Sequence, residues 1–158
     1  MTEIERIKDQ SKRVFDGDAW HGPSLMTILA DVSPSQAASR PFSGAHSIWE
    51  LVHHIAAWER AGIRRMAGDP ANLTDDEDWP AVSDTSEIAW QQTKDMLRAV
   101  HNEFQDAISR LDESRLDQPI VAGLKTTYVT LHGIIQHTLY HAGQIAILKK
   151  AIGAGANK

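Results

Sequence analysis

The sequence predicts an all-α four-helix bundle with a kinked or split first helix and a central metal site. Apolar residues recur at helical spacing in four long segments, and no segment alternates as a strand does. Proline and glycine interrupt the connections between these segments. The last segment carries a narrow stripe of histidines on an otherwise apolar helix, and bundles place metal sites between facing helices.

The first predicted helix covers residues 2–15, with Ile4, Ile7 and Val14 on one face. A second stretch, residues 23–32, begins with a proline that suits the first turn of a helix. The two stretches are either one kinked helix or two helices end to end.

The next long helix is expected from residue 48 to about residue 67. Ser47 and Glu50 have the spacing of a capping box, in which each side chain accepts a hydrogen bond from the other residue's backbone N–H. Residues 33–44, which contain two prolines and a glycine, are expected to form a loop before it.

The third long helix is predicted from about Asp84 or Glu87 to about Leu111. The acidic run 75–78 before it is interpreted as part of a solvated loop, because it lacks the spacing of a calcium loop.

The fourth long helix is predicted from about residue 127 to about residue 151. Residues 112–126 connect it to the third helix, and residues 120–122 within them suit a short extended piece. Residues 1–152 are expected to form one domain and residues 153–158 a flexible C-terminal tail.

Composition narrows the classes of function. A hydrophobic fraction of 42% with 23% charged residues is ordinary for a globular domain. A net charge of −5 argues against nucleic acid as a partner, and no apolar run is long enough to span a membrane. The chain has no cysteine, and its start is too charged for a secretory signal, so a cytoplasmic location is expected.

The polar stripe of the last helix contains His137, His141 and Gln144, which fall together with Leu148 within roughly 60° of one another on a helix. Two imidazoles one turn apart can share a metal ion, although a hydrogen-bonded pair in the core gives the same pattern.

Helical phase selects a third imidazole. On the second long helix His54 lies roughly 80° from the centre of the apolar face, whereas His53 lies roughly 180° away, toward solvent. His54 is therefore the predicted partner of the pair in the last helix.

Three neutral imidazoles leave a bound divalent cation with its full charge and with an open position for a substrate. Zinc, nickel and iron(II) all suit imidazole, so the ligand set does not select the metal. Gln144 could orient a metal-ligating side chain or a water by a hydrogen bond, and His21, at a helix break, could face the site. Glu59 is expected to be solvated.

Residues 47–59 and 131–145, together with 20–23 and 78–80, resemble the DinB-like (YfiT-like) four-helix-bundle superfamily. The resemblance covers nearly the whole chain. It implies a divalent metal, often zinc or nickel, held by one histidine of the second long helix and two of the last, which correspond to His54, His137 and His141.

The resemblance also implies several functions. Some members are thiol transferases that use bacillithiol or mycothiol, and one is a mycothiol-dependent isomerase; in these the metal holds the thiol as thiolate. We expect a thiol S-transferase acting on small electrophiles. The alternatives are a hydrolase that uses metal-bound water and a non-catalytic stress-response or binding bundle. Many members are homodimers, which the apolar last helix allows here.

Overall fold

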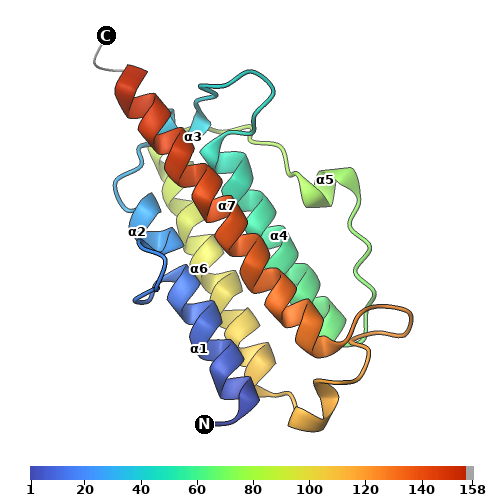
Figure 1. The fold of residues 1–158 in the computed structure, drawn as a ribbon. Helices are drawn as coiled ribbons and strands as arrows, with labels where there is room; N and C mark the ends of the chain where they lie inside the picture. The colour runs from blue at the N-terminus through green and yellow to red at the C-terminus, as the bar shows by residue number, and fades with distance from the viewer. Residues whose placement is uncertain (156–158) are drawn as a thin grey trace.

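Four long helices make up the bundle, as predicted (Figure 1). The computed structural model describes residues 1–155, and within these residues there is no β-strand. The long helices are α1 (Glu3–Phe15), α4 (Ile48–Met66), α6 (Glu87–Ser109) and α7 (Thr127–Gly155). Both α4 and α1 pack against α6 and against α7, so the four helices close around a common core.

A long connection between α4 and α6 decides the topology. After α4 ends, residues 67–86 run back along the outside of the bundle, so that α4 and α6 point in the same direction while α1 and α7 point in the other (Figure 1). This connection carries the one-turn helix α5 (Asp75–Asp78), which contacts α4. The region predicted as a solvated acidic loop therefore contains a helical turn that lies against the bundle.

The first helix is split rather than kinked. A turn closed by the bridge between Ala19 and Gly22 separates α1 from α2 (Leu25–Leu29), which is shorter than the predicted stretch 23–32. The side chains of α2 are mostly buried against α7.

Two expectations for the connections were wrong. Residues 33–44 contain the short helix α3 (Pro34–Ala38), because Ser33 and Gln36 form a capping box around a proline in the first turn. Between α6 and α7 lies a 3-10 turn, η1 (Glu113–Arg115). Residues 120–122 form no strand, because Ile120 instead closes a turn with Lys125.

The predicted capping box at the start of α4 is confirmed. The Ser47 side chain accepts from the Glu50 N–H at 3.2 Å, and the Glu50 carboxylate accepts from the Ser47 N–H at 2.7 Å. This cap fixes where α4 begins and therefore which residues of α4 face α7.

Two clusters of buried apolar side chains fill the bundle. One surrounds Trp49 and Trp90 and is closed by α2 and α3, and the other surrounds Phe104 and Leu131 near the opposite end. At Gly62 an added Cβ would lie 2.4 Å from Ile134 Cδ1 and 3.0 Å from Phe104 Cε2, so glycine lets α4 approach its neighbours closely.

The last helix extends to Gly155, beyond the expected end near residue 151. Residues 156–158 of the predicted tail lie outside the described residues, and the boundary at residue 152 stays a prediction. Among the helices described here, none has an apolar stretch of the length needed to cross a bilayer.

Candidate metal centre

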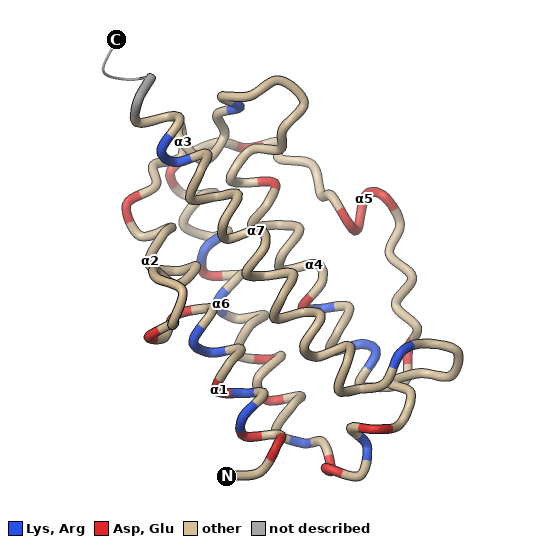
Figure 2. The backbone as a smooth tube through the Cα atoms, viewed as in Figure 1, with Lys and Arg blue, Asp and Glu red and all other residues tan. Residues whose placement is uncertain are grey.

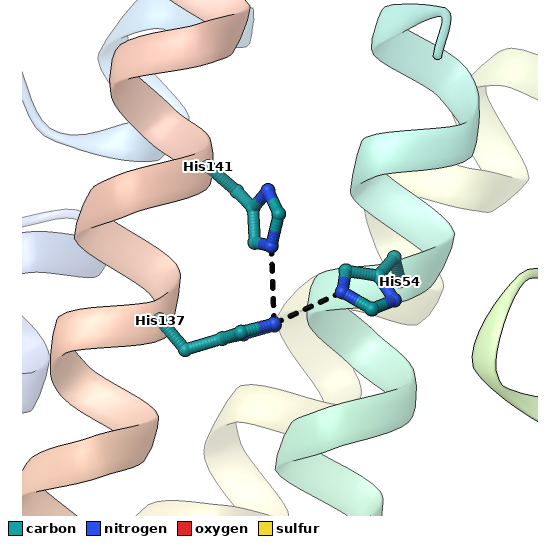
Figure 3. A group of neighbouring side chains, drawn as sticks. All are labelled: His54, His137 and His141. Carbon is teal, nitrogen blue, oxygen red and sulfur yellow. Dashed lines mark hydrogen bonds between the residues drawn. The ribbon is translucent and has the colours of Figure 1, made fainter. Parts of the chain in front are cut away.

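Three histidine rings converge at the seam between α4 and α7 (Figure 3). His137 Nε2 lies 3.0 Å from His54 Nε2 and 3.1 Å from His141 Nε2. One ligand atom from each ring lies within 4.8 Å of the others, and the His54 and His141 side chains are buried. The structure thus brings together the three residues that helical phase had selected.

The two long helices position these rings in different ways. His137 and His141 project from one face of α7 because they are one turn apart. His54 reaches the same point from α4, which packs along α7. The close packing of the two helices, rather than any loop, sets the separation of the rings.

The spacing suits a divalent cation. Four nitrogen ligands at about 2.1 Å around a tetrahedral zinc would lie about 3.4 Å from one another. The separations of 3.0 and 3.1 Å between His137 Nε2 and the other two nitrogens are slightly shorter, so these two would need to widen by only a few tenths of an ångström around a bound ion.

Acceptors behind two of the rings fix their tautomers. His54 Nδ1 lies 2.8 Å from the Asp78 carbonyl oxygen and 3.1 Å from the Asp78 Oδ1. His141 Nδ1 lies 2.6 Å from Gln144 Oε1. Because these oxygens only accept, each Nδ1 carries the proton, and each Nε2 presents a lone pair to the cluster.

His137 cannot satisfy both of those lone pairs. A single N–H at His137 Nε2 can donate to one neighbour only, and His137 Nδ1 is buried without a hydrogen-bond partner. Protein hydrogen bonds therefore leave the cluster incompletely satisfied, which is the arrangement that a cation would complete.

Burial keeps two of these imidazoles neutral. Burial and the neighbouring His141 and His54 lower the pKa of His137 to about 3. Burial also lowers the pKa of His141, against the opposing effect of its hydrogen bond with Gln144. Neutral imidazole is the form that binds a metal, so both rings are ready to act as ligands at neutral pH.

Aromatic rings form a wall around His54. Trp79, the residue that follows α5, stacks on the His54 ring at 3.8 Å between centroids, and His46 also stacks on Trp79, at 3.6 Å. The Trp58 indole N–H donates to Asp78 Oδ1 at 2.8 Å. These contacts hold both the His54 ring and the carboxylate that orients it.

The sequence interpretation missed Asp78 and Trp79 as parts of the site. The spacing of Thr74 and Glu77 offered a signal, since it is that of a capping box and the structure forms this box at the start of α5. Nothing in the sequence could have indicated that this turn packs against His54.

Gln144 lies where the sequence suggested, behind His141. His21 is exposed in the turn before α2, and no hydrogen bond or ring contact among the described residues joins it to the cluster. His53 is half-buried and reaches Thr93 Oγ1 at 3.4 Å, so the prediction that it faces solvent was wrong.

Glu59 was also predicted wrongly, because it is buried. Its side chain faces α6, where Glu59 Oε1 pairs with His101 Nδ1 at 2.9 Å, and Phe15 stacks on the His101 ring at 3.7 Å. Burial raises the pKa of Glu59, while the contact with His101 opposes that change. This second polar pair lies on the α6 side of α4 and takes no part in the histidine cluster.

Comparison with known proteins gave one match. The sequence matches the DinB superfamily over residues 20–145, a range that includes all three histidines of the cluster. Searches of curated proteins and of solved structures returned no match. The match spans well over half of the chain, and the all-α bundle with its histidine cluster agrees with it. The chain therefore belongs to the DinB superfamily.

Proposed function

We propose that the protein is a metal-dependent thiol S-transferase that acts on small electrophiles. The observation that supports this most directly is the meeting of three imidazole nitrogens, two of them fixed as lone-pair donors, with no fourth protein ligand in the described cluster. Catalytic sites keep such an open position, whereas structural zinc sites are usually closed by four protein ligands.

A divalent cation bound here would supply undiminished positive charge, which favours the thiolate form of a bound thiol. The chain's own residues provide the setting. Asp78 and Gln144 hold two rings in the required tautomer, and the packed indole of Trp79 shields His54. The protein has no cysteine, so the thiol has to come from a cosubstrate.

Next to the cluster lies a mainly apolar cleft of about 290 Å³. Phe42, Leu51 and Ile147 contribute apolar walls, and Gln144 and His46 line its polar part. Gln144 connects the cleft to His141 through its hydrogen bond. A small apolar electrophile would fit this space beside the cluster.

A hydrolase is the second proposal, and it is less well supported. Activation of water usually needs a general base beside the metal. Asp78 is the carboxylate that contacts the cluster, and its Oδ1 already accepts from the Trp58 indole N–H and lies 3.1 Å from His54 Nδ1. Glu59 pairs with His101 instead. The described residues thus place no uncommitted carboxylate on the three rings.

The test uses zinc- and nickel-loaded protein with a chlorinated dinitrobenzene and bacillithiol, mycothiol or glutathione in turn. The thiol loses its proton to solvent, its sulfur bonds to the ring carbon, and chloride leaves. We expect acceleration with at least one thiol, lost in His137→Ala and retained in His132→Ala, a matched change of a histidine outside the cluster. No acceleration with any thiol would reject the transferase, and hydrolysis of an ester panel that depends on His137 would favour the second proposal.

A further inference from the structure

A second cleft lies on the other side of His137, between the C-terminal part of α4 and the first half of α7. It has a volume of about 280 Å³, and its walls are mostly apolar. The lining residues that matter here are Trp58, Arg65, Lys125, Gly133, Ile134 and His137.

The cleft meets the histidine cluster at His137. The His137 ring lines both, and the Trp58 ring lies 5.6 Å from it between centroids. Trp58 also donates to Asp78, which orients His54. A molecule in this cleft would therefore lie against the ring whose Nε2 stands between the other two.

Two cationic side chains line the cleft. The Arg65 guanidinium lies over the Trp58 ring, 5.3 Å from its centroid, and Arg65 Nε donates to the Pro70 carbonyl oxygen at 3.1 Å. Lys125, in the loop before α7, is exposed. Within the described part of the chain neither side chain forms an ion pair with a carboxylate. In Figure 2 basic segments at the end of α4 and before α7 lie near each other.

The positive charge of Arg65 and Lys125 is opposite in sign to the net charge of the whole chain, which is −5. The Arg65 guanidinium is held by the backbone carbonyls of Pro70 and Ala71 and by the aromatic face of Trp58 rather than by an acid, and the rest of its five N–H donors remain for a ligand. Arginine and lysine together on an otherwise apolar cleft are suited to a small molecule with an anionic end and an apolar body.

We propose that this cleft binds the carboxylate end of a small organic substrate or thiol cosubstrate, with Arg65 and Lys125 as the residues that recognise the anion. The apolar body lies along Ile134 and Trp58, toward His137. The assignment of this ligand as a reactant rests on the proposed function, whereas the binding of the carboxylate itself can be tested without any catalysis.

The binding test uses metal-loaded protein, the probe 3-phenylpropionate and its neutral counterpart 3-phenylpropanamide. The dissociation constants are obtained from shifts of the Trp58 indole N–H signal in NMR spectra, which report on this cleft. We expect the carboxylate to bind at least about tenfold more tightly than the amide, as a charge-assisted contact implies.

Three variants of lining residues and one control locate the binding. Lys125→Gln and Arg65→Gln should each lower the affinity for the carboxylate probe several-fold and leave the affinity for the amide probe nearly unchanged. The control Lys150→Gln, which removes a charge elsewhere on α7, should change neither affinity. Gly133→Leu should weaken both probes, because a Cβ at Gly133 meets nothing within 4 Å and a larger side chain would extend into the cleft without a clash.

Equal affinity for the two probes would overturn the proposal. So would a preference for the carboxylate that survives both cationic substitutions, since the anion would then be bound by the metal alone. If the preference is observed and depends on Arg65 and Lys125, but no thiol is transferred in the assay above, the cleft assignment stands and the proposed function fails.

Discussion

Asp78 is the residue through which the connection between α4 and α6 acts on the histidine cluster. Its carbonyl oxygen accepts from His54 Nδ1, and its carboxylate Oδ1 lies 3.1 Å from the same nitrogen and accepts from the Trp58 indole N–H. Removing such a partner of a ligand commonly costs about 10–100-fold in metal affinity. Because Asp78→Ala keeps the carbonyl and removes only the carboxylate, we expect it to weaken zinc binding by about tenfold, the lower end of that range, measured by competition with a chelating dye.

The matched control for Asp78→Ala is Asp76→Ala, which removes an exposed carboxylate from the same turn. The zinc affinity of Asp78→Asn should lie between those of the two alanine variants, because an amide oxygen still accepts a hydrogen bond but carries no charge. An affinity for zinc that is the same in Asp78→Ala and Asp76→Ala would show that the Asp78 carboxylate does not support metal binding.

His137 gives the metal-free protein a predictable response to acid. Its pKa in the folded state is about 3, below the value of about 6.5 for an unperturbed histidine. Between these values the unfolded chain binds a proton that the folded chain does not, so the free energy of unfolding falls as pH falls through this window. His137→Gln should remove the part of this dependence that comes from His137 and leave the part that comes from His141, whose pKa is also lowered.

The measurement is urea unfolding of both metal-free proteins from pH 7 to pH 5. We expect the stability of the wild type to fall relative to that of His137→Gln as the pH is lowered. A constant difference between the two proteins would mean that His137 titrates at the same pH in the folded and unfolded states.

At the residue scale, helical phase was sufficient to choose His54 over His53 and to pair it with His137 and His141. Phase reports which side of a helix a residue occupies, and the three rings lie on sides that face each other. Helical phase could not predict that Asp78 belongs to the site or that Glu59 is buried. Each depends on a partner far away in the sequence: Asp78 contacts His54, and Glu59 contacts His101.

Among the helices, α5 is the one whose local sequence, through its cap, most directly affects the site. It has four residues, none of them buried, so it depends on its cap rather than on packing. The Thr74 side chain accepts from the Glu77 N–H at 3.3 Å, and the Glu77 carboxylate accepts from the Thr74 N–H at 2.8 Å. The cap of α5 therefore helps to hold Asp78 and Trp79 against His54.

Thr74→Ala should loosen this turn without unfolding the bundle. Loss of a cap costs about 1 kcal/mol, which corresponds to a reduction of about fivefold in metal affinity if the cost falls on the turn alone. Thr85→Ala, which changes an exposed threonine outside any cap, is the control. Unchanged zinc affinity in Thr74→Ala, measured by the same dye competition, would show that α5 stays in place without its cap.

The same small elements limited the prediction of structure. The long helices were expected nearly at their observed bounds, since each has an apolar face and a clear start or end. The turns α3 and α5 were read as loops, because their few residues show no periodicity and only their capping boxes indicate them.

Across the whole molecule, the direction of the helices could not be predicted. Residues 67–86 were expected as a connection, but whether it crosses the bundle end or returns along its side depends on packing (Figure 1). The return along α4 makes α4 and α6 parallel and brings α5 against α4, where Asp78 contacts His54, and so completes the surroundings of the cluster.

The outer side of α7 suggests a second copy of the chain as a partner, and this stays a prediction. Before Lys149 the helix has no charged residue (Figure 2), and Val129, Tyr140 and Ile147 are 50, 65 and 61% exposed. Exposed apolar side chains along one helix are typical of an interface. Analytical ultracentrifugation should show that the wild type is a dimer and that Tyr140→Lys is a monomer. The control Asn102→Lys, which changes an exposed residue of α6, should remain a dimer. A monomeric wild type would contradict this prediction.

Removal of the metal tests the role of the centre in the molecule as a whole. Both apolar clusters are formed by side chains other than the three histidines, so the bundle has its core without an ion. A metal that binds only the folded chain still adds stability, about 2.7 kcal/mol at a hundredfold excess over its dissociation constant.

We therefore expect chelation to lower the melting temperature and to leave the helical circular dichroism at 25 °C unchanged. His137→Ala should show no response to the chelator. Loss of the helical signal on chelation would instead indicate a structural metal, as in domains that fold only around their ion, and would favour the non-catalytic alternative over the transferase.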